Sequence, residues 1–217
     1  ARNLSNRPID MNVLYIGSDY SINHIHAERL HPGSGPGFDG GLLFFFHALV
    51  TSVAFLWGAN EGRWESLDDV WIGNFLTSSR IATAMLGTLI VPVGFQIGRR
   101  WGRDVALMTA FLLAVLSPLV REAHFALTDT PLTLLIALTL LCSLRAQEDE
   151  RWRSIVLAGA SAGLAAAVKY NGAIACALPG IAALSYAPGR RVSALLLAGA
   201  SAIGAFLLAA PYTVLDL

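Results

Sequence analysis

Residues 105–144 decide the fold class of this chain. They read VALMTAFLLAVLSPLV, then REAHFALTDTP, then LTLLIALTLLCSL, without a break. The two outer segments, Val105–Val120 and Leu132–Leu144, contain no charged residue. The connection Arg121–Pro131 between them holds two acids, an arginine, a histidine and two threonines. Ionisable groups are costly close to hydrocarbon, so they usually mark a working site there. The stretch therefore predicts two membrane-crossing segments that are joined by a functional connection.

The composition of the whole chain agrees with a membrane protein. Of the 217 residues, 55% are hydrophobic and 14% are charged, whereas a soluble domain has about a quarter charged residues. The apolar residues fall in blocks, and each block flanked by polar residues is a candidate span. The candidate spans are Ile81–Ile97, Val105–Val120, Leu132–Leu144, Ile155–Val168, Ala173–Ala187 and Val192–Ala210. Runs of small residues at 158–163 and 198–201 suit close packing between such helices.

The position of the arginines predicts how the spans are oriented. Arginines follow the first, third and fifth spans, and loops rich in arginine face the cytoplasm. The connection Arg121–Pro131 and Lys169 then lie on the outer face. The aromatic block Leu42–Trp57 could span the membrane or lie along its interface, and its short length favours the interface. We therefore expect a first extracytoplasmic loop over residues 1–79, with an interfacial helix near 42–57, and a bundle of about six helices over residues 80–217.

Other classes of site have weaker support. The net charge is zero, so a nucleic acid partner is not expected. No glycine-rich nucleotide loop occurs, and no cofactor is expected. His24, His26 and His31 with Glu28 could ligate zinc, but no second cluster completes such a site, so a divalent metal remains unsupported. Both ends of the chain look cut, which predicts a fragment of a longer membrane protein.

Four short motifs follow one another in a specific order. They are Arg80–Gly87 (RIATAMLG), Gly98–Arg100 (GRR), Ser117–Thr133 (SPLVREAHFALTDTPLT) and Val168–Gly172 (VKYNG). Each motif alone is weak, but four in this order on the expected faces are fairly specific. They resemble the GT-C glycosyltransferases, in particular the branch that is similar to dolichyl-phosphate-mannose–protein mannosyltransferases and aminoarabinose transferases.

The resemblance implies a fold, an activity and a location. The fold would be all-α, a polytopic membrane bundle of GT-C type with extracytoplasmic juxtamembrane helices and a further helix before residue 1. The activity would move a sugar from a polyprenyl-phosphate donor to a protein, lipid or glycan acceptor. The location would be the bilayer of a bacterial cytoplasmic (inner) membrane, crossed several times, with the active site facing outward.

The predicted site combines a base, cations and an apolar groove. Asp19, in Gly17-Ser18-Asp19-Tyr20, stands where the family has an acidic pair, and we expect it to be the base; it could instead only form a turn, and Asp10 is a second candidate. Asp129 is expected to orient the acceptor or the first-loop acid, although it could simply cap a helix. The predicted substrate-binding residues are Arg80, Arg121, Glu122, His124, Thr128, Lys169 and Tyr170.

Several alternatives stay open. Lys169 could contact the donor phosphate or only snorkel to the interface, and Arg80 could do the same or anchor its helix. A multi-span transporter would place charges such as Asp129 near mid-membrane and would show repeated halves. The charges lie at the ends of the spans instead, which favours an enzyme. The altered first loop also allows a catalytically inactive homologue.

Overall fold

A computed structural model describes residues 9–16, 22–30, 41–66 and 72–211, and the chain divides into two compact units. The first unit, Ala1–Phe38, contains an antiparallel hairpin of strands β1 (Ile9–Ile16) and β2 (Ile22–Leu30). The register pairs Ile9 with Leu30 and shifts between Val13 and Leu14. This hairpin is an addition to the predicted all-α fold. The alternation of apolar and polar residues over 9–13 is the pattern typical of a strand.

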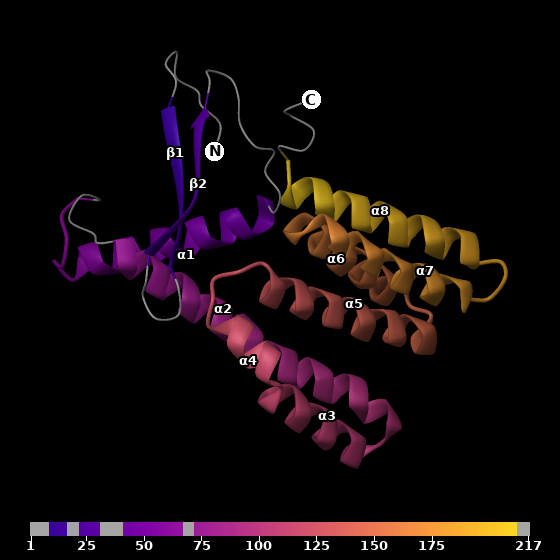
Figure 1. The fold of residues 1–217 in the computed structure, drawn as a ribbon. Helices are drawn as coiled ribbons and strands as arrows, with labels where there is room; N and C mark the ends of the chain where they lie inside the picture. Colours follow the sequence, from indigo (N-terminus) through magenta and orange to yellow (C-terminus); the bar gives the residue numbers. More distant parts are fainter. Residues whose placement is uncertain (1–8, 17–21, 31–40, 67–71, 212–217) are drawn as a thin grey trace. The chain divides into compact units, whose positions relative to one another are not determined.

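The second unit, Asp39–Leu217, contains helices as its regular elements within the described residues (Figure 1). Three of them, α2, α5 and α8, are long and apolar enough to cross a membrane, and the bent pair α3–α4 adds a fourth if it forms one span. This confirms the prediction of an all-α polytopic membrane protein. The helices are α1 (Gly41–Asn60), α2 (Ile72–Gly98), α3 (Arg103–Val115), α4 (Ser117–Ala123), α5 (Asp129–Asp149), α6 (Trp152–Val168), α7 (Ala177–Leu184) and α8 (Arg191–Ala209), with 3₁₀ turns η2 (Arg99–Trp101) and η3 (Tyr170–Cys176).

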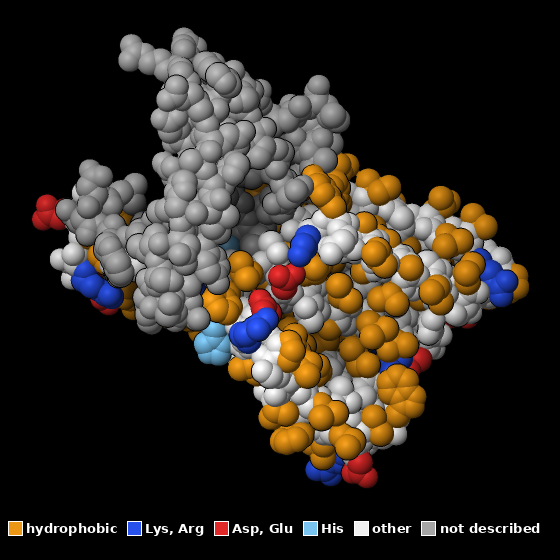
Figure 2. Space-filling model, in the orientation of Figure 1, with side chains coloured by type: hydrophobic (Ala, Val, Ile, Leu, Met, Phe, Trp, Pro, Cys, Tyr) orange, Lys and Arg blue, Asp and Glu red, His pale blue; other side chains and the backbone are white. Residues whose placement is uncertain are grey.

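The surface of these helices agrees with a bilayer environment. Figure 2 shows hydrophobic side chains over most of the visible face of the described helices. Met108, Phe111 and Leu208 are among the large apolar side chains that are exposed. An apolar surface of this extent is unusual on a soluble monomer, and lipid chains would cover it.

Three predicted spans differ from the observed helices. The segment expected over Ala173–Ala187 contains the end of the 3₁₀ turn η3 and the short helix α7 in place of one long helix. The helix expected over Ile81–Ile97 begins earlier, at Ile72, so α2 crosses the predicted domain boundary at residue 80. The single helix expected over Val105–Val120 is wrong, because Leu116 is extended and α3 and α4 meet at an angle of 54°. Pro118 explains the break: inside a continuous helix it would remove a hydrogen bond and clash with the preceding turn, whereas it fits the first turn of α4.

Helix α6 lies at the centre of the packing. Nine of its 17 residues are buried, and seven of these are alanine or glycine. A Cβ atom added to Gly159 or Gly163 would overlap the carbonyl oxygen of Ala198 or Ala202 on α8. The two backbones therefore touch where side chains are absent, as small-residue motifs allow in membranes. The small-residue runs were expected to suit close helix packing, and the structure packs those of α6 and α8 against each other.

Helices α2 and α5 run in the same direction, and α6 returns beside α5. Near the start of α5, a Cβ atom on Gly87 would lie 2.9 Å from the Cβ of Ala123 and 3.4 Å from a methyl group of Thr130. Near its end, Arg145 donates a hydrogen bond to Gln96 of α2. The unit therefore has two ends. One end holds the start of α5 and the end of α6, and the other holds the end of α5 and the start of α6.

We expect Gly163→Leu to destabilise the helical unit. The added side chain meets a backbone carbonyl rather than a side chain that could turn away, and overpacking of this kind costs about 1–3 kcal/mol. Thermal unfolding of the detergent-solubilised protein should show a clear fall in Tm. Gly199→Leu on α8 is the matched control, because a Cβ atom there meets no atom within 4 Å. Equal Tm values for the two variants would contradict the close α6–α8 contact.

Candidate functional site

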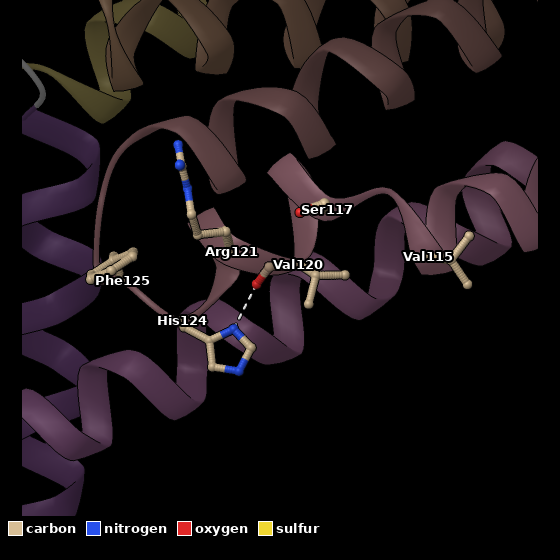
Figure 3. A pocket seen from close by; sticks show the side chains of 6 residues that line it. All are labelled: Val115, Ser117, Val120, Arg121, His124 and Phe125. Carbon is tan, nitrogen blue, oxygen red and sulfur yellow. Dashed lines mark hydrogen bonds between the residues drawn. The ribbon is translucent and has the colours of Figure 1, made fainter. Parts of the chain in front are cut away.

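The connection between α4 and α5 forms one side of the candidate site. The bend at Leu116 turns α4 away from the direction of α3, and an open groove of about 510 Å³ lies along the bend (Figure 3). The lining is mostly apolar, with a guanidinium and an imidazole at one end. It is formed by Val115, Ser117, Val120, Arg121, His124 and Phe125.

Asp129 lies at the start of α5. It is the first helical residue, and Thr128 occupies the capping position without a side-chain capping bond. The predicted helix start is therefore confirmed, but Asp129 is not the capping residue itself. Its carboxylate lies in the first turn, where the partial positive charge of the helix end stabilises an anion.

Lys169 stands where α6 ends. The helix stops at Val168, Lys169 adopts an extended conformation, and the chain continues into η3. Because α6 returns beside α5, the end of α6 lies next to the start of α5. The Lys169 Nζ donates a hydrogen bond to Asp129 Oδ1 over 3.1 Å. Two residues of separate predicted motifs are thus joined as an ion pair.

This ion pair is open to its surroundings. The side chains of Lys169 and Asp129 are 46% and 48% exposed. An ion pair with this exposure contributes about 0–1 kcal/mol to stability. Packing accounts for the positions of the two helices, so the stability of the fold does not require the pair. A half-exposed carboxylate and ammonium that lie together can instead bind a ligand.

The side chains of Arg121 and His124, at the end of α4, point in different directions. Arg121 donates to Glu122 Oε1 over 2.9 Å, and its side chain is 73% exposed. The His124 Nδ1 lies 2.6 Å from the Val120 carbonyl oxygen, which can only accept, so Nδ1 carries the hydrogen. Figure 3 shows the Arg121 side chain extending away from that of His124. The predicted pair Arg121–Glu122 is therefore present, and His124 is separated from Arg121.

Arg80 lies on the face of α2 that is turned toward α4 and α5. Residues at intervals of three and four share a helix face, which places Arg80, Thr83 and Gly87 together. Thr83 is fully buried, and Gly87 approaches Ala123 and Thr130. Arg80 is half-buried about 10 Å along the helix from Gly87. It makes no ion pair or hydrogen bond within the described part of the chain.

The remaining predicted binding residues lie beside the ion pair. Tyr170 follows Lys169 as the first residue of η3, and its side chain is 53% exposed. Thr128 precedes Asp129 and is half-buried, and its carbonyl accepts a hydrogen bond from Leu132 N over 3.0 Å. The first turn of α1 also reaches this end of the unit, because Leu42 packs against Leu132 and Val168.

The acid predicted as the base belongs to the first unit of the chain. Asp19 lies outside the described residues, and of Asp10 only the backbone of β1 is described. The same holds for the His24, His26 and Glu28 side chains, which suggested a metal site. Among the side chains that the structure does describe, no group of three or more His, Cys, Asp or Glu residues could hold a metal ion.

His47 is a polar residue that the sequence did not single out. Neither ring nitrogen has a hydrogen-bond partner within the described residues, and both are buried. It lies on α1, five positions after Leu42, which packs beside the start of α5. Burial lowers the pKa of this imidazole, so the neutral form is favoured. The sequence could have pointed to His47, because it is the only histidine in the apolar aromatic block Leu42–Trp57.

A known protein family matches most of this chain. The family model described as dolichyl-phosphate-mannose-protein mannosyltransferase matches residues 44–213. The chain belongs to this family. The match runs from α1 to the residues after α8 and therefore includes Arg80, Asp129 and Lys169, whereas Asp19 lies before it. Comparison with curated proteins and with solved structures gives no match.

Membership of this family agrees with the resemblance seen in the four motifs. The chain is thus an integral membrane glycosyltransferase of the mannosyltransferase type. Residues of the two motifs around Asp129 and Lys169 meet at one end of the helical unit, where the end of α4, the start of α5 and the end of α6 supply polar groups. Family membership and the paired groups together make this end the candidate active site.

We expect Asp129→Asn and Lys169→Gln each to change the free energy of unfolding by less than about 1 kcal/mol, because the pair is half exposed. Thermal unfolding in detergent should show a shift of no more than roughly 4 °C. Leu134→Ala, which truncates a buried side chain of α5, should give a larger fall. If Asp129→Asn lowered Tm as much as Leu134→Ala does, the ion pair would be shown to stabilise the fold.

Proposed function

We propose that this glycosyltransferase takes its sugar from a polyprenyl-phosphate donor and transfers it to a protein, lipid or glycan acceptor at the extracytoplasmic face. The observation that carries the proposal is the Asp129–Lys169 pair. A carboxylate and an ammonium from two helices meet, half exposed, at one end of a membrane-embedded unit of the mannosyltransferase family.

The reaction requires positive charge beside the leaving group. The acceptor oxygen forms a bond to the anomeric carbon, and the bond from that carbon to the phosphate oxygen breaks, so its electron pair stays on the phosphate. Lys169 donates one hydrogen bond to Asp129 and retains further N–H donors for phosphate oxygens. In this proposal Arg80 and Arg121 add their guanidinium groups to the same anion. Preorganised cations of this kind lower the barrier by stabilising the charge that develops.

The proton of the acceptor must be taken up by a carboxylate. Asp19 is the proposed base, in line with its place in the first loop. Asp129 holds the Lys169 ammonium through one oxygen, which leaves its other oxygen to orient an acceptor hydroxyl. In this scheme the two acids have different tasks, one that accepts the proton and one that positions the cation and the acceptor.

The groove at the bend gives the donor a place for its lipid chain. Val115, Val120 and Phe125 offer apolar surface, and Arg121 lies at the same groove. A prenyl chain along the apolar part would leave its phosphate near the guanidinium. Glu122, His124, Thr128 and Tyr170 are proposed to contact the sugar or the acceptor around it.

We expect the α4–α5 connection and the far end of α5 to lie on opposite sides of the membrane, because α5 is long enough to cross it. Leu127→Cys and Gln147→Cys, in a chain with Cys142 and Cys176 replaced by alanine, place one exposed thiol at each end. A membrane-impermeant maleimide should label position 127 in intact cells and position 147 only after permeabilisation. The reverse pattern would overturn the outward-facing site.

The catalytic proposal predicts that Asp129→Asn and Lys169→Gln lower turnover by roughly 100-fold or more, because each removes a charge from the reacting site. The assay follows sugar transfer by the purified full-length protein from a panel of polyprenyl-phosphate sugars, with mannose and aminoarabinose donors first. A nucleotide sugar serves as the donor control.

The matched control is Glu150→Gln. Glu150 also forms a partly exposed ion pair, with Arg190 over 3.5 Å, but it lies after α5 at the opposite end of the unit. Its turnover should equal that of the unaltered protein. Full turnover in Asp129→Asn would remove Asp129 from the site, and transfer from the nucleotide sugar alone would contradict the donor class.

A further inference from the structure

A second hollow lies at the end of the helical unit opposite to Asp129 and Lys169. It has a volume of about 370 Å³ and opens between the end of α2, the turn η2 and the end of α5. Its lining differs from that of the groove at the bend, because charged and amide side chains dominate. The lining residues are Gln96, Arg99, Arg100, Leu141, Arg145 and Glu148. The proposed glycosyl transfer uses none of them.

The positive charge of this hollow is only partly compensated. It contains three guanidinium groups and one carboxylate. Arg100 is 15% exposed and donates to Glu148, which is itself 61% exposed. Arg145 donates to the neutral amide of Gln96, and Arg99 has no ion pair within the described residues. Two positive charges therefore remain without a carboxylate in the hollow.

The arrangement of the donors suits a phosphate. Each guanidinium presents a planar fork of N–H groups that matches phosphate oxygens. Within the described residues, Arg145 donates one side-chain hydrogen bond and Arg99 donates none. The two arginines come from different helices, so a small anion in the hollow could bind both. Leu141 is buried and forms an apolar floor on α5.

The position of the hollow indicates where such a phosphate comes from. Helices α2 and α5 are both long and apolar enough to cross a membrane, so their ends reach the level of the lipid headgroups. Trp101, next to Arg100, is 65% exposed, and tryptophan is enriched at that level. Basic pockets between helix ends bind anionic headgroups in membranes.

We propose that this arginine hollow binds the phosphate of an anionic phospholipid headgroup, with Arg99 and Arg145 as its main ligands. The site is independent of the proposed sugar transfer, because it lies at the other end of α5 and shares no residue with the site around Asp129. An anionic lipid bound there would hold α2 and α5 together through charges that the protein leaves uncompensated.

The test measures lipid binding by the full chain in detergent. Native mass spectrometry counts bound phosphatidylglycerol, with zwitterionic phosphatidylcholine and inorganic phosphate as separate arms. We expect phosphatidylglycerol to bind preferentially. Arg99→Gln combined with Arg145→Gln should weaken binding by roughly fivefold per arginine, hence about 25-fold in total. The double variant keeps the Arg100–Glu148 pair, and thermal unfolding of each preparation verifies that the compared samples are folded.

Arg153→Gln is the matched control. It removes one positive charge from the same end of the unit, on the exposed part of α6, but Arg153 does not line the hollow. This variant should bind phosphatidylglycerol like the unaltered protein. Equal weakening by Arg153→Gln, equal binding of phosphatidylcholine, or undiminished binding by the folded double variant would each overturn the proposal. Binding of inorganic phosphate alone would overturn the lipid as its source.

Discussion

The close approach of α6 to α8 is the contact on which the candidate site depends. Gly159 and Gly163 leave no side chain between the two backbones, so α6 can lie deep in the unit with α5 on another side. The end of α6 therefore lies beside the start of α5. Lys169 and Asp129 are brought together by this packing and not by their own attraction, which is weak for half-exposed charges.

The bilayer adds a second constraint on the polar groups. Backbone groups in hydrocarbon must be paired internally, so the chain can break its helices only where water, protein or headgroups satisfy them. The described charges of α5 accordingly lie near its two ends, Asp129 at one and Arg145, Glu148 and Asp149 at the other. The charged groups are therefore gathered at the two ends of the helical unit. One end presents a carboxylate, an ammonium and a groove, and the other presents guanidinium groups.

The bend at Leu116 shows how a local defect creates a surface. In a straight helix through Pro118, Val115 and Arg121 would lie along a single helix axis, with no bend between them. The break separates α3 from α4, and an apolar groove with a guanidinium beside it forms along the bend. In the proposed function, this groove holds the lipid chain of the donor.

The class of the chain followed from its residues one segment at a time. Blocks of apolar residues predict helices in a membrane, and the run of small residues at 158–163 predicts close packing against another helix. The motifs around Arg80, Asp129 and Lys169 likewise indicated the family that the match over residues 44–213 confirms. These are properties of short windows, which the sequence displays directly.

The sequence by itself thus determined a membrane protein whose second unit is helical, with a polar connection at Arg121–Pro131, and it marked the residues that could act there. Only the tertiary structure decided that Asp129 pairs with Lys169, 40 positions away, and that Arg99 and Arg145 share a hollow. The physical reason is that these contacts depend on the register and direction in which helices pack. Register and direction are set by the whole set of neighbours and leave no mark in a single segment.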